Sequence, residues 1–63
     1  MKVEIRIGSI EGVLMDEGVL NSIPRVGDTV MITGYTRKVI DVVWDFKRIP
    51  EVAIMILDVE AQE

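Results

Sequence analysis

The 63-residue sequence contains no cysteine, no histidine and only three aromatic residues. Without cysteine the chain forms no disulfide and offers no thiolate to zinc, and without histidine it lacks the commonest general base. A serine nucleophile needs such a base, so the serines are expected to be turn residues. The glycines match no phosphate-binding motif, and no metal or cofactor site is predicted. We therefore predict a protein that is not an enzyme.

Long apolar stretches are also missing. No run approaches the roughly 18 residues of a membrane span. The first seven residues, MKVEIRI, alternate charged and aliphatic side chains and lack the continuous apolar core of a signal peptide. Together with the absence of disulfides, this pattern predicts a cytoplasmic protein with no membrane partner.

The chain is rich in β-branched residues, since valine and isoleucine together number 19. This density favours strands over helices. Short strands at regular intervals, with no helix between them, predict an all-β fold, a small five-stranded SH3-like barrel over residues 1–59. Residues 60–63 are expected to form a frayed acidic tail. The expected extended segments are 2–7, 10–15 with 19–22, 29–33, 37–46 and 52–59, and a turn or bulge is expected at residues 16–18.

The segment 37–46, RKVIDVVWDF, is the longest run of strand-forming residues and holds the only Trp and the only Phe. Regular alternation places Trp44 and Phe46 on one face and Val39 and Val43 on the other. A strand that is apolar on both faces belongs in the middle of a small barrel or at an interface. We expect this segment to be the central strand, with both aromatic rings in the core.

The segment 23–28, IPRVGD, carries a proline and a glycine and is expected to cross one end of the barrel as a loop. Ile23 and Val26 are expected to plug that end. A hairpin turn is expected at Thr33, Gly34 and Tyr35, leading into the central strand.

The sequence IPRVGDTV at 23–30, followed by Gly34, by VIDVVW at 39–44 and by an apolar final strand, resembles short all-β proteins encoded by bacteriophages and mobile elements. The resemblance covers residues 23–57 and implies a small barrel with no catalytic residues. The segment VGDTVMITG at 26–34 is also similar to the opening of the KOW motif of ribosomal and transcription-elongation proteins. The later glycines of that motif are replaced here, by Thr36, Lys38 and Asp41.

The net charge of −4 is unevenly distributed. Residues 23–50 hold five bases against three acids, a net +2, whereas residues 51–63 hold four acids and no base, a net −4. The central region is thus the place where an anionic partner could be attracted. An isoelectric point near 4.6 argues against nucleic acid as the favoured partner. The candidate partner-binding residues are Arg25, Tyr35, Arg37, Lys38, Lys47 and Arg48.

The final strand is apolar on both faces, which makes it a candidate for contact with another chain. We predict a homo-oligomer with Val52, Ile54 and Ile56 at its interface. The favoured function is a non-catalytic protein-interaction module, an accessory protein of a phage or mobile element. One alternative is a KOW-like nucleic-acid-binding module that uses the basic residues between 25 and 48. The other is an acidic inhibitor of a host nucleic-acid enzyme, in which Asp58, Glu60 and Glu63 imitate nucleic-acid charge.

Overall fold

The computed structural model describes residues 1–60, which form five strands and no helix. The all-β class and the small five-stranded barrel predicted from the sequence are confirmed. The turn or bulge expected at residues 16–18 is instead a register shift one residue earlier, because Ile5 pairs with Asp16 and Arg6 with Leu14, which leaves Met15 as the additional residue. Residues 16–18 themselves are part of a continuous second strand. The predicted acidic tail lies mainly outside the described residues. The strands are β1 (Lys2–Ile7), β2 (Leu14–Val19), β3 (Thr29–Ile32), β4 (Tyr35–Asp45) and β5 (Val52–Leu57).

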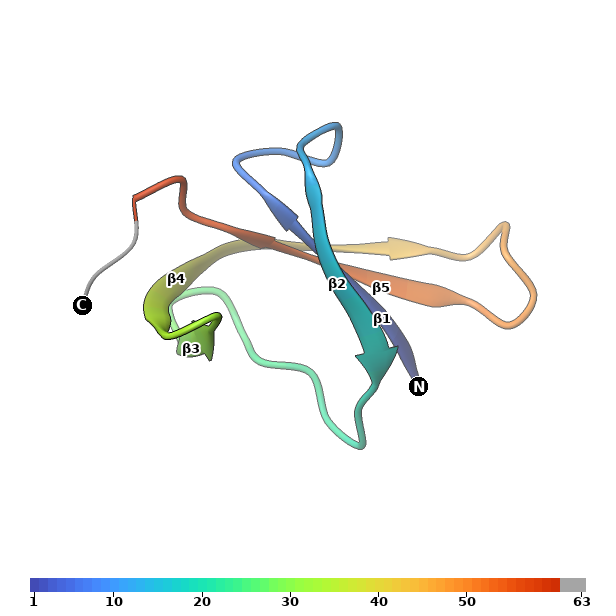
Figure 1. Cartoon of the computed structure of the whole chain (residues 1–63). Coiled ribbons are helices and arrows are strands. Elements are labelled where there is room, and N and C mark those ends of the chain that lie inside the picture. The colour runs from blue at the N-terminus through green and yellow to red at the C-terminus, as the bar shows by residue number, and fades with distance from the viewer. Residues whose placement is uncertain (61–63) are drawn as a thin grey trace.

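The strands form one curled sheet in the order β2-β1-β5-β4-β3 (Figure 1). β1 and β5 pair in parallel, and the other neighbours are antiparallel. No pairing joins β2 to β3 within residues 1–60, so the sheet is a half-barrel with two free edges. Residues 20–28 connect those two edge strands as a loop (Figure 1).

The strand in the middle of the sheet is β5, and every one of its residues is buried. Ala53, Met55 and Leu57 lie on the inner face, where they form the main core with residues of β1 and β4. The alternate side chains of β5 form a smaller buried cluster on the outer face. The prediction that segment 37–46 is the central strand is therefore wrong, because β5 alone pairs with neighbours on both sides along its whole length.

A β-bulge changes the faces of β4. Val39 pairs with Leu57, but the next paired residue is Asp41, which leaves Ile40 as the additional residue. The extra residue shifts the alternation by one position. Val39 consequently lies on the same face as Trp44, the inner face, and not opposite to it as strict alternation predicts.

The aromatic residues are less buried than the sequence suggested. β3 pairs only with residues 35–38 of β4, so the second half of β4 has no neighbour on that side. Trp44 is consequently 41% exposed. Phe46, just beyond the end of β4, is 76% exposed. The expectation that both rings lie in the core is wrong.

The crossing loop and the hairpin turn largely follow the predictions. Ile23 packs against the inner core, but Val26 is 62% exposed and does not plug the barrel. Thr33 and Gly34 both have positive φ, 55° and 85°, as a two-residue hairpin turn of type I′ requires. The predicted turn is therefore present but shorter than expected, because Tyr35 already pairs with Ile32 as the first residue of β4. Thr33 is a β-branched residue in a conformation that such residues rarely adopt.

Candidate protein-binding surface

An apolar groove of about 350 Å³ lies between the crossing loop and β4. Residues 23–26 of the loop form one wall, and Val42 and Trp44 of β4 form the other. The groove opens where β4 extends beyond β3, because no further strand covers the inner face there. We call this site the aromatic groove; its lining residues are Ile23, Pro24, Arg25, Val26, Val42 and Trp44.

A pair of stacked aromatic rings borders the groove. The ring centroids of Trp44 and Phe46 are 6.4 Å apart and the ring planes differ by 11°. Trp44 lies near the end of β4, and Phe46 is in the turn that directly follows this strand. The pair therefore extends the apolar surface of the groove towards solvent.

The loop wall is held by backbone contacts. The N–H of Arg25 donates to Oδ2 of Asp28 at 2.8 Å, and the N–H of Asp28 donates to the carbonyl of Arg25 at 3.0 Å. Gly27 and Asp28 are in turn bonded to Val39 of β4. The Arg25 guanidinium makes no ion pair or hydrogen bond within residues 1–60. A fixed loop thus presents an unpaired cation beside an apolar groove.

Two of the predicted partner-binding residues have structural roles. Arg37 donates from Nη1 to the carbonyls of Asp58 at 2.9 Å and Val59 at 2.8 Å, and so fixes the chain after β5. Arg48 forms ion pairs with Glu4 of β1 and with Asp45 of β4, the latter at 3.1 Å. These contacts lower the availability of both guanidinium groups to a partner.

The ion pairs of Arg48 cross the outer face of β5. Glu4 and Asp45 lie on the two strands that flank β5, so the Arg48 side chain that joins them passes over its outer side chains. Glu4 is only 6% exposed and also pairs with Arg6 at 3.3 Å. The hydrogen bond from Arg48 lowers the pKa of Glu4, against the opposing effect of burial. The same bond raises the pKa of Arg48.

The residues predicted to form an oligomer interface lie under this cover. Val52, Ile54 and Ile56 are 2%, 4% and 4% exposed in the single chain. Their burial corrects the sequence-based assignment, because a second copy would meet the residues that cover them and not these three side chains. The apolar character on both faces of the strand reflects its central position in the sheet.

The remaining predicted residues do not gather in one site. Lys38 lies beside Asp58 and Glu60, which offset its charge. Tyr35 is 44% exposed at the hairpin between β3 and β4. Lys47 is exposed in the turn between β4 and β5. Of the six predicted partner-binding residues, Arg25 is the one that lines the aromatic groove.

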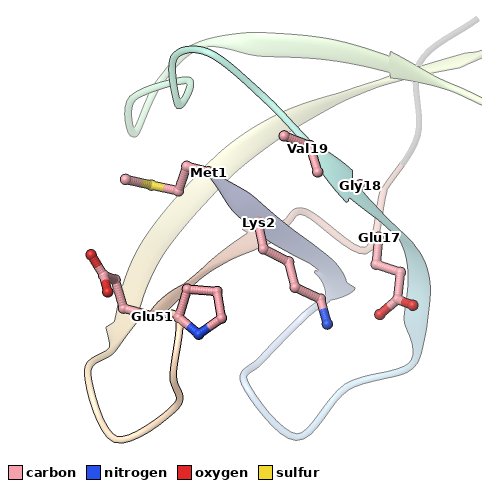
Figure 2. A pocket seen from close by; sticks show the side chains of 7 residues that line it. Met1, Lys2, Glu17, Gly18, Val19 and Glu51 are labelled. Carbon is pink, nitrogen blue, oxygen red and sulfur yellow. The ribbon is translucent and has the colours of Figure 1, made fainter.

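A wider depression of about 630 Å³ lies where the start of β1, the end of β2 and the turn before β5 meet (Figure 2). Its charged lining residues are Lys2, Glu17 and Glu51, so one cation faces two carboxylates. It contains no aromatic side chain. The mixed charge and the absence of an aromatic anchor make it a weaker candidate than the aromatic groove.

Among residues 1–60, no three acidic side chains lie close enough together to hold a metal ion. The same residues include no helix that could cross a membrane. Neither the family models, nor the curated proteins, nor the solved structures with which the chain was compared match it. The function is therefore inferred from the sequence and from the geometry of the chain alone.

Sequence reasoning assigned most of the groove residues to the core. Val26 was missed as a surface residue because it was expected to plug the end of the barrel, and Phe46 because it was assigned to the central strand 37–46. One signal was present for Phe46: it is followed by Lys47 and Arg48, and this change to polar composition marks the end of a strand. The groove itself depends on the bulge and on the short length of β3, which composition does not reveal.

Proposed function

We propose that the protein is a non-catalytic interaction module that binds a partner protein at the aromatic groove. The observation that carries the proposal is the stacked pair of Trp44 and Phe46 beside an apolar groove. Exposed aromatic residues that border a pocket are typical of binding hot spots, because burying them against a partner removes a large apolar area from water.

Arg25 adds a requirement for charge. A carboxylate on the partner would gain a charge-assisted hydrogen bond from its unpaired guanidinium. A volume of about 350 Å³ is at the lower end of ligand pockets and suits one or two bulky side chains. The partner that fits is therefore an extended segment of a protein in which an apolar residue is close to an acidic one.

The resemblance of residues 23–57 to phage and mobile-element proteins covers both walls of the groove, and we propose an accessory protein of such an element as the setting. Nucleic-acid binding receives less support, because Arg37 and Arg48 are engaged within the chain and Lys38 lies beside two acids. The proposal that the chain inhibits a nucleic-acid enzyme rests on Asp58, Glu60 and Glu63. Asp58 and Glu60 lie beside Lys38, which offsets part of their charge, and Glu63 lies outside the described residues.

The proposal is tested by selecting binders from a displayed library of random peptides and titrating the selected peptides. Trp44 is the only tryptophan, so a change in its fluorescence reports occupation of the groove directly. We expect the selected peptides to combine an apolar residue with a carboxylate. Arg25→Glu should weaken their binding by about 10- to 100-fold, the equivalent of one charge-assisted hydrogen bond of ~1.5–3 kcal/mol.

Phe46→Ser should also weaken binding, since it removes one ring of the stacked pair. Lys2→Glu is the matched control, because it makes the same change of charge at a residue outside the groove. Selected peptides that leave Trp44 fluorescence unchanged, or that bind Arg25→Glu and Lys2→Glu equally well, would contradict the proposed function.

A further inference from the structure

The half-barrel has two free strand edges, and they differ in how well they are protected. β2 and β3 each lie at one end of the sheet, so each has one edge without a neighbouring strand. Such an edge presents unpaired N–H and C=O groups and can pair with another chain unless something blocks it. The residues at the two edges decide which of them is available.

The edge of β2 is blocked. Met1 and Leu20 exchange hydrogen bonds, so the alternation of an antiparallel ladder directs the backbone groups of Glu17 and Val19 towards the free edge. The outward N–H of Glu17 is already bonded to Oδ1 of Asp16, at 2.8 Å. Two adjacent carboxylates therefore stand at the middle of this edge, where they repel a second copy of the same strand.

The edge of β3 is open. The N–H of Val39 bonds to the carbonyl of Asp28, so the same alternation directs the backbone groups of Thr29 and Met31 away from β4. Among residues 1–60, no backbone hydrogen bond joins this edge to another segment. The strand sequence TVMI carries no charge, and Met31 is 73% exposed. In the described part of the chain, neither a charged side chain of β3 nor a backbone hydrogen bond at this edge opposes pairing.

We propose that two copies of the chain pair through β3 in antiparallel orientation, with a two-fold axis perpendicular to the sheet at Met31. Val30 and Ile32 pack against the inner core, so they have to remain on the same face in the joined sheet. The register centred on Met31 meets this condition, and it places Val30 opposite Ile32 of the second copy and Met31 opposite Met31. The outward N–H and C=O groups of the two Met31 residues then face each other and exchange two hydrogen bonds.

The pairing closes at two copies. Pairing of β3 with β2 of another copy would instead be head-to-tail and could propagate into a filament. Asp16 and Glu17 block the strand edge that this alternative requires. The paired strand has four residues in each copy, against the roughly 20–30 residues a side of a standard interface, so the dimer is expected to be weak. This inference goes beyond the proposed function, since the aromatic groove does not include β3.

Sedimentation equilibrium from micromolar to millimolar concentration tests the dimer. The wild-type protein should pass from monomer to dimer in this range. Met31→Lys places two like charges opposite each other and should raise the dimer Kd by at least about tenfold. Val19→Lys is the matched control on the blocked edge, because Val19 is 76% exposed and its backbone groups also point outward. It should dimerise like the wild-type protein.

A second measurement uses the absence of cysteine. Met31→Cys introduces the only thiol, and directly opposite residues with exchanged hydrogen bonds have Cα atoms about 5.5 Å apart, within the range of a disulfide. Mild oxidation should give a covalent dimer of Met31→Cys much faster than of Val19→Cys. A wild-type protein that stays monomeric to millimolar concentration, a Met31→Lys variant that dimerises as tightly as Val19→Lys, or equal cross-linking of the two cysteine variants would overturn the inference. Monomeric Met31→Lys should still bind the peptides selected for the groove, so a failure of the dimer can be told apart from a failure of the proposed function.

Discussion

Alanine substitutions at two glycines of the β1–β2 hairpin, Gly12 and Gly18, should change the stability in opposite directions. A Cβ atom added at Gly12 would lie 1.8 Å from the carbonyl oxygen of Ile7, which is far inside van der Waals contact. A Cβ atom added at Gly18 in β2 would meet nothing within 4 Å. Gly12→Ala is therefore expected to be destabilising and Gly18→Ala to be tolerated or stabilising.

The loss of stability expected for Gly12→Ala can be worked out from the hydrogen bonds that the loop would lose. Moving Gly12 away from Ile7 breaks the hydrogen bonds from Gly12 N–H to Ser9, from Ile7 N–H to Val13 and from Arg6 Nη1 to Gly12. Two neutral bonds and one charged bond contribute roughly 3–5 kcal/mol in total. The whole domain is expected to have a stability of about 3–9 kcal/mol at 0.05–0.15 kcal/mol per residue. Gly12→Ala should thus remove about half of the stability or more.

Gly18→Ala should instead add about 0.4–1 kcal/mol, because alanine restricts the unfolded chain without straining the strand. The assay is urea unfolding followed by Trp44 fluorescence and by circular dichroism. With a slope near 1 kcal/mol/M, the midpoint should fall by roughly 3 M or more for Gly12→Ala and rise by about 0.5 M for Gly18→Ala. A Gly12→Ala midpoint within about 1 M of the wild-type value would show that the loop is not packed as described.

Other substitutions test the turn, the ion pairs and the core. Thr33→Asn should stabilise the protein by about 1 kcal/mol and raise Tm by about 5 °C, because asparagine adopts positive φ more readily than a β-branched residue; an unchanged or lower Tm in calorimetry would contradict this. The pKa of Glu4 is lower in the folded protein than its ordinary value of 4.5, so the unfolded state takes up a proton first as the pH falls. The ion pairs of Glu4 therefore contribute to stability above pH 4.5, and this contribution is lost as the pH falls below that value. Urea midpoints of Glu4→Gln should therefore depend less on pH across that range than those of the wild-type protein, and equal slopes would refute the role of Arg48. Leu57→Ala, at a residue with no exposure, should cost about 3–4 kcal/mol, whereas Ile49→Ala, at a residue 99% exposed, should stay within about 0.5 kcal/mol; similar urea midpoints for these two variants would place the core elsewhere.

The sequence predicted best those elements whose pattern depends on residues close together along the chain. Lys2–Ile7 alternates strictly and forms β1 over the same residues. The hairpin turn at residues 33–35 was also predicted, although Tyr35 belongs to β4 and not to the turn. The turn or bulge assigned to residues 16–18 was misplaced, because Gly18 continues the strand opposite Val3 and the extra residue of β2 is Met15.

The proposed binding surface was harder to predict, because it depends on which strands are neighbours in the sheet and not on patterns along the chain. Arg25 was identified as a candidate from its charge, and it lines the groove. Arg37 and Arg48 were chosen on the same ground, yet both bond to groups distant in sequence. Trp44 was assigned to the core because tryptophan is usually well buried, and the short β3 leaves it exposed.

The sequence by itself determined the fold class. Short strands joined by turns are predicted by the density of β-branched residues, by the alternation at the N-terminus and by the positions of glycine and proline. The tertiary structure decided which strand is central and which aromatic residues meet solvent. The physical reason is that strand order is set by pairing between segments far apart in the chain, and a single bulged residue reverses the face of every side chain on one side of it.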